Sequence, residues 1–118
     1  MSGVQTPFSG ILAALSRHRG VTGSMVVGEG DGIVVDSNLH VGVRGDAVAA
    51  LAASLYRKVR RSSHAAGFGG VTFLQLEADR GQLCVAGRGR LVLVAVAERD
   101  VNVGLLRAEM RRALDVLA

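Results

Sequence analysis

The three histidines and the single cysteine are the residues in this sequence best suited to metal binding or nucleophilic chemistry. His18, His40 and His64 lie on three separate segments, and none has a second ligand at the short spacing that zinc sites use. Cys84 alternates with apolar neighbours and has no nearby base that would activate its thiol, which is typical of a buried structural cysteine. The sequence therefore predicts no metal site, no cofactor and no catalytic residue.

Glycine-rich segments are the next candidates, because such loops can bind phosphate groups. A nucleotide-binding P-loop has the pattern G-x-x-x-x-G-K-[ST] between a strand and a helix. Residues 28–32 contain no lysine and precede a strand-like segment, and residues 87–90 also lie between two strand-like segments. Both segments therefore predict hairpin turns. The chain is not expected to bind GTP itself or to be an enzyme.

A cluster of basic residues near the end of the longest predicted helix is the strongest charged feature. It consists of Arg57, Lys58, Arg60 and Arg61. One interpretation is a solvated helix end whose positive charges favour the negative end of the helix dipole. The other is a surface for an acidic protein partner, with Arg57, Arg60 and Arg61 as the binding residues. A more specific and less favoured version of this second interpretation is that one of these arginines stabilises the transition state of GTP hydrolysis in a partner.

The length and composition of the chain indicate one globular domain over residues 1–118. A chain of 118 residues is too short for two independent cores, and 49% of its residues are hydrophobic while 20% are charged. We expect the few large side chains of the core to be those of Phe8, Phe68 and Phe73. The net charge is +4, but aromatic residues make up only 3%. Nucleic acid is therefore not an expected partner, because too few side chains could stack on bases.

Nothing in the sequence predicts a membrane partner or an export route. No apolar run reaches the roughly 18 to 20 residues that a membrane-spanning helix needs. The N-terminus lacks the charged segment and apolar stretch of a secretory signal. One cysteine allows no intramolecular disulfide, in agreement with a reducing compartment. We therefore expect a cytoplasmic protein.

Apolar spacing and turn residues predict three helices and five strands. Helices are expected over residues 7–19, 46–64 and from 103 onward, with Thr6, Asp46 and Asn102 as their caps, and strands over 21–27, 33–35, 71–77, 82–86 and 90–97. Residues 91–97 are apolar on both sides, so this strand must be covered on both faces and lie at the centre of the sheet. The order predicts a three-layer α/β/α sandwich around a mostly antiparallel sheet.

The longest predicted helix has two distinct faces. The apolar stripe expected to pack on the sheet contains Val48, Leu51, Ala52, Leu55 and Val59. The opposite face has small residues in its first half and basic residues in its second, namely Ala49, Ala50, Ala53, Arg57 and Arg60. We expect the small part of this face to allow another protein surface to approach closely.

Four segments together resemble the roadblock/dynein light chain family, and within it the MglB-like bacterial members. They are GVTGSMV at 20–26, DG at 31–32, DAVAALAA at 46–53 and NVGLLR at 102–107. The resemblance covers essentially the whole chain. It implies a profilin-like domain whose five-stranded antiparallel sheet has the order 2-1-5-4-3. The long helix is then expected on one face and the two terminal helices on the other.

The resemblance also implies a homodimer in which third strands pair edge to edge and long helices pack together. We expect its interface to contain Ala49, Ala50, Ala53, Val71, Phe73 and Gln75. Many MglB-like members are partners of small Ras-like GTPases, so a regulatory module for such a GTPase is the leading functional hypothesis. The alternatives are a structural scaffold subunit without a GTPase and, less favoured, a small-ligand sensor.

Overall fold

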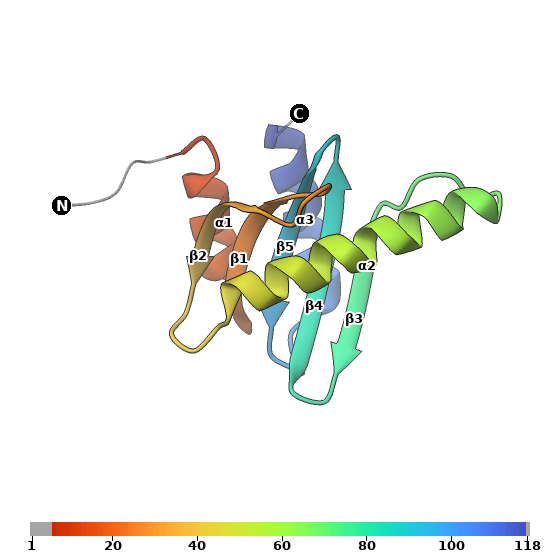
Figure 1. Ribbon diagram of the computed structural model, residues 1–118. Coiled ribbons are helices and arrows are strands. Elements are labelled where there is room, and N and C mark those ends of the chain that lie inside the picture. The colour runs from red at the N-terminus through yellow and green to blue at the C-terminus, as the bar shows by residue number, and fades with distance from the viewer. Residues whose placement is uncertain (1–5, 118) are drawn as a thin grey trace.

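The helices and strands follow one another along the chain in the order that the sequence predicts (Figure 1). The computed structural model describes residues 6–117. Their helices are α1 (Ser9–Ser16), α2 (Gly45–Ala65) and α3 (Val103–Leu117), and their strands are β1 (Val21–Gly28), β2 (Val34–Leu39), β3 (Leu74–Ala78), β4 (Gly81–Arg88) and β5 (Leu91–Ala97). Among these residues, no helix has the length and apolarity needed to cross a membrane.

The five strands form one sheet in the order β2-β1-β5-β4-β3, and every neighbouring pair is antiparallel. Helix α2 crosses one face of the sheet, and α1 and α3 cover the other (Figure 1). Strand β5 is central, and its residues 92–95 are completely buried. The predicted three-layer α/β/α fold and strand order are therefore confirmed, and β2 and β3 are the two edges of the sheet.

Several predicted boundaries are wrong by a few residues. Strand β2 continues to Leu39, four residues past its predicted end at residue 35, because an edge strand can carry polar side chains on its exposed face. Strand β3 begins at Leu74 rather than at Val71. Helix α2 begins at Gly45, so Asp46 lies in its first turn instead of capping it.

The terminal helices form one side of the core. Helix α1 is shorter than predicted: Phe8 occupies its N-cap position, and Thr6 lies in the preceding turn, where its hydroxyl accepts a hydrogen bond from the Phe8 amide. Asn102 caps α3 as predicted, since its side-chain oxygen accepts a hydrogen bond from the Leu105 amide at 3.0 Å. Large side chains from both helices and the sheet meet here, including Leu12, Leu15, Leu93, Leu106 and Met110.

Candidate interaction surfaces on helix α2 and the β3 edge

Helix α2 packs on the sheet through a face of small residues. Ala49, Ala52 and Ala53 are buried and, with Tyr56, form a core cluster with strands β1, β4 and β5. The predicted packing face is therefore wrong in part: Ala52 is buried and Val48 packs against this cluster as predicted, but Leu51 is 49% exposed. It follows that Ala49 and Ala53, which the sequence placed in a dimer interface, belong to the core of their own chain.

Two glycines explain why small residues face the sheet. Gly32 has a φ of +72°, and a side chain there would meet Ala50 and Ala53, so the β1–β2 turn lies directly against α2. Gly87 in β4 leaves no room for a Cβ atom beside the ring of Tyr56. The Tyr56 hydroxyl donates a hydrogen bond to the Val71 carbonyl at 3.2 Å. These contacts fix the rotation of α2 about its own axis and turn its leucines away from the sheet.

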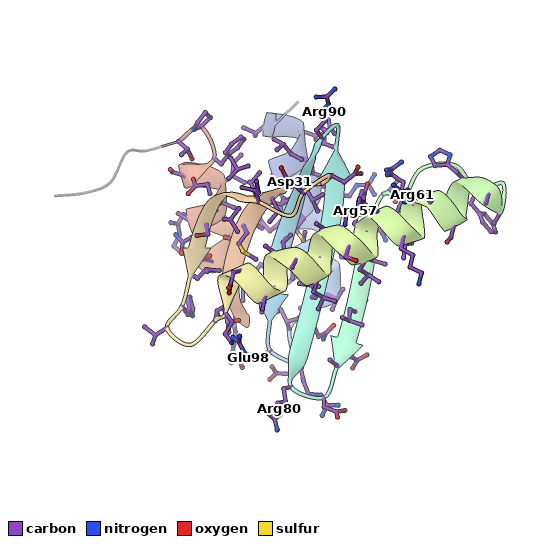
Figure 2. All side chains as sticks on the ribbon, viewed as in Figure 1. Asp31, Arg57, Arg61, Arg80, Arg90 and Glu98 are labelled. Carbon is purple, nitrogen blue, oxygen red and sulfur yellow. The ribbon has the colours of Figure 1, made fainter. Side chains whose placement is uncertain are left out.

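An apolar cavity opens between the N-terminal half of α2 and the strands beneath it. Its volume is about 250 Å³. Its apolar lining comes from Val48 and Leu51 of α2 and from Leu76, Ala78, Leu83, Val96 and Ala97 of the sheet. The polar residues around it include Arg80 and Glu98, which lie at the end of the molecule that carries the β3–β4 turn (Figure 2). The cavity therefore adjoins the edge strand β3.

Of the remaining residues predicted for a dimer interface, Val71, Phe73 and Gln75 lie at or near this edge, whereas Ala50 lies beside the β1–β2 turn. Gln75 of β3 and Ala50 of α2 are exposed. Val71 and Phe73 precede β3 and are half-buried. The Phe73 ring packs against the α1–α3 side of the core, with the Arg107 guanidinium 5.4 Å from its centroid. Phe73 thus packs largely within its own chain, and the exposed Gln75 donates a side-chain hydrogen bond to Gln82 at 2.5 Å.

The basic residues of α2 divide into two pairs. Arg60 forms a bidentate ion pair with the Glu29 carboxylate of the β1–β2 turn, at 2.9 and 3.2 Å. Arg57 donates to the backbone carbonyls of Glu29 and Gly30 in the same turn. By contrast, Lys58 and Arg61 are exposed, and within residues 6–117 neither forms an ion pair. Of the three predicted partner-binding arginines, Arg57 and Arg60 are bonded to the β1–β2 turn, and Arg61 forms no ion pair with the residues that the structure describes.

Phe68 is the largest departure from the predicted core, because it is 85% exposed. It follows the C-terminal end of α2, whose last turns extend past the β3 edge (Figure 1). Gly67 and Gly69 on either side both have positive φ angles. Such glycines mark a chain reversal after a helix, and this was the signal in the sequence against a core position for Phe68.

The described residues offer little chemistry of their own. Cys84 is buried in the α1–α3 core, and burial raises the pKa of its thiol to about 11. Among residues 6–117, no three histidine, cysteine or acidic side chains are grouped in a way that could hold a metal ion.

Comparisons with known proteins agree with this architecture. The family model described as "Roadblock/LC7 domain" matches residues 9–97. An uncharacterized protein of Methanocaldococcus jannaschii is 35% identical over 112 residues, which are 95% of this chain and 94% of that protein. A second protein from the same organism is 33% identical over 105 residues, 89% of this chain and 91% of that protein.

Solved structures share the same fold. A Roadblock/LC7 domain from Streptomyces avermitilis superposes with a TM-score of 0.82 at 24% identity, covering 92% of both chains. Myxococcus xanthus MglB gives a TM-score of 0.80 at 21% identity, covering 93% of both chains. A structure described as MglB with tetrameric arrangement gives 0.84 at 18% identity, covering all of this chain and 92% of the other.

Proposed function

Because the chain belongs to the Roadblock/LC7 domain family, we propose that it works as a non-enzymatic dimeric module that binds and regulates a small Ras-like GTPase. The fold that it shares with MglB structures is consistent with a regulatory role. The GTPase partner itself follows from the resemblance to MglB-like members. The observation on this chain that supports the proposal is the outward face of α2, which is apolar in its first half and basic in its second.

The dimer part of the proposal rests on surfaces that a single chain leaves uncovered. Leu51 is exposed beside an apolar cavity, and that cavity adjoins the edge strand β3. An edge strand with free backbone groups next to exposed apolar side chains favours association. Pairing of two β3 strands about a two-fold axis would continue the sheet and bring both copies of α2 together on one face.

The partner part rests on the charge of the α2 end. Lys58 and Arg61 are exposed and unpaired within the described residues, while Arg57 and Arg60 add positive charge behind them. A surface of this kind steers an acidic partner and makes association slower as the salt concentration rises. Arg57 and Arg60 contribute through this field, because their guanidinium groups already hold the β1–β2 turn.

Calorimetry with purified proteins tests the proposal. We expect the dimer to bind a small Ras-like GTPase from the same genome when that GTPase carries a non-hydrolysable GTP analogue. The double variant Lys58→Glu with Arg61→Glu should weaken binding at least about tenfold, because it reverses the rim charge of the interface. The matched control reverses two arginines of α3 on the other side of the sheet, Arg111→Glu with Arg112→Glu, and should bind normally.

The outcomes separate the alternatives. If the α3 variant loses binding and the α2 variant does not, the partner binds the α1–α3 side and our placement is wrong. If the protein is a dimer but none of these GTPases binds, the chain is a structural scaffold. The protein alone should release no phosphate from GTP, and turnover that a point mutation in this chain abolishes would contradict a non-enzymatic role.

A further inference from the structure

We propose that Phe68 of one copy inserts into the apolar cavity between α2 and the sheet of a second copy. This inference rests on the proposed dimer and adds to it a specific anchor and socket. The anchor is the side chain of Phe68, and the socket is the cavity lined by Val48, Leu51, Leu76, Leu83 and Val96 together with its small neighbours.

The anchor is presented by an ordered turn. The Phe68 amide donates to the Ser63 carbonyl at 2.9 Å, and the Ser63 hydroxyl donates to the Gly69 carbonyl at 2.7 Å. The chain from the last turn of α2 to Gly69 is therefore closed by hydrogen bonds on both sides of Phe68. Because the backbone around Phe68 is already ordered, binding has to fix only the side-chain torsions of the ring, which favours its use as a contact.

The socket matches a phenyl ring in chemistry and size. Its lining is almost entirely apolar, and its volume is about 250 Å³. An apolar cavity of about 150 Å³ is enough to hold benzene. Leu51 at the mouth is 49% exposed, so part of the wall is also in contact with solvent. Burying both Leu51 and Phe68 would remove two exposed large apolar side chains from water at once.

Symmetry brings the anchor to the socket. When two antiparallel edge strands pair in one sheet, the two-fold axis is perpendicular to the sheet, so an element that extends past β3 in one copy lies over the same face of the other. The end of α2 with Arg61 lies toward the β4–β5 turn and Arg90, whereas Arg80 and Glu98 lie at the opposite end of the molecule (Figure 2). A half-turn rotation exchanges these ends and moves the α2 end of one copy toward the socket of the other.

Charged side chains surround both parts of the proposed contact. The exposed side chains at the end of α2 include Arg61 and His64, and no acidic residue follows Asp46 on this helix. The socket is lined by one exposed residue of each charge, Arg80 and Glu98. Glu98 can therefore pair with the basic end of α2, while the apolar lining receives Phe68.

Cysteine cross-linking tests the contact directly. In a chain with Phe68→Cys and Leu51→Cys, 14 residues of α2, or about 21 Å of helix, separate position 51 from the end of the helix at Ala65, so the two thiols cannot form a disulfide within one copy. We expect mild oxidation to convert this variant into a covalent dimer. A variant with Phe68→Cys and Val116→Cys is the matched control, because Val116 is also exposed but lies on α3. It should stay uncross-linked, as should the wild type, whose only thiol is buried.

Light scattering separates this inference from the proposed dimer. A wild-type monomer at micromolar concentration would overturn both. With each cysteine variant at a concentration where light scattering shows it to be dimeric, a Phe68–Leu51 pair that cross-links no better than the Phe68–Val116 pair would overturn the inference alone. As a second measurement, Phe68→Ala should raise the dimer dissociation constant at least about tenfold. Val116→Ala should leave it unchanged, and equal effects of the two substitutions would also overturn the inference.

Discussion

The two faces of the sheet are covered in opposite ways. On the α1–α3 side, large side chains of both helices point inward, and Leu12, Leu15, Leu106 and Met110 are almost completely buried. On the α2 side, the helix turns alanines toward the sheet and leaves Leu51 outside. The cavity on the first side, about 280 Å³, lies between α1 and α3 and is lined by no strand residue, so we call this side the closed layer. The open layer, on the α2 side, has its apolar cavity against the sheet itself and beside the edge strand β3.

This difference shows how one helix can serve two interfaces. Small residues let α2 lie close to the valines of the sheet, and Tyr56 adds one large contact against Gly87. The larger apolar residues then remain available on the outer side. Because burial of large side chains contributes most to stability, we expect the α1–α3 layer to carry the stability of the fold. The α2 layer should contribute mainly to association.

The largest expected effect comes from the closed layer. Leu106→Ala should lower the free energy of unfolding by about 3 kcal/mol, because it removes a fully buried side chain and leaves a cavity that the packed helices cannot fill. Urea denaturation measures the loss. The difference from wild type should be the same at low and high protein concentration, and a loss that appears only at high concentration would contradict the assignment of this layer to the single chain.

The corresponding substitution in the open layer should act on association. Leu51→Ala should raise the dimer dissociation constant about tenfold and change the free energy of unfolding of the dissociated chain by less than about 0.5 kcal/mol, since Leu51 is half-exposed in one copy. Analytical ultracentrifugation over a concentration series measures the first quantity. If Leu51→Ala destabilises the chain as strongly as Leu106→Ala does, the proposed division between the layers is wrong.

Much of the fold was predictable because it depends on local patterns. Residues 91–97 lack alternation, which requires cover on both faces and places this strand at the centre of the sheet. The cap at Asn102 depends only on the residues that follow it. The order of all five strands came from the resemblance, because strand order depends on contacts between segments far apart in the chain.

The rotation of α2 was predicted wrongly because its sequence allows two apolar stripes. Leucines and valines mark one stripe, but Ala49, Ala52, Ala53 and Tyr56 have the equally regular spacing i, i+3, i+4, i+7. Hydrophobicity favours the leucines, whereas close packing on a sheet favours the alanines. The role of Arg60 could not be read from the sequence either, since its partner Glu29 is 31 residues away.

A smaller effect is expected from the contact that joins α2 to the β1–β2 turn. Glu29→Gln should lower the free energy of unfolding by about 1 kcal/mol, because it removes a bidentate ion pair whose carboxylate is mostly shielded from water. Thermal unfolding at low salt measures it. Asp115→Asn is the matched control, since the Arg88–Asp115 pair is exposed and 3.4 Å long, and it should have almost no effect. Equal losses would mean that the turn does not hold α2 in place.

The smallest expected effect is a pH dependence inside the closed layer. The thiol of Cys84 has an ordinary pKa of 9.0, and burial raises it to about 11 in the folded chain. As the pH rises past 9, the thiol ionises in the unfolded chain but not in the folded one. The contribution of Cys84 is thus fully present below pH 9 and is lost progressively between pH 9 and about 11.

Comparison with Cys84→Ala isolates this contribution. At pH 9.5 the wild type should have lost about 0.8 kcal/mol through Cys84 relative to pH 7.5, and the variant should not share that loss. The cost of the smaller side chain is independent of pH, and Tyr56, whose pKa is also raised by burial, is common to both proteins. Urea denaturation of both proteins at the two pH values gives the difference. Equal losses in wild type and variant would mean that the thiol is reached by water, and the α1–α3 layer would then be less closed than its packing indicates.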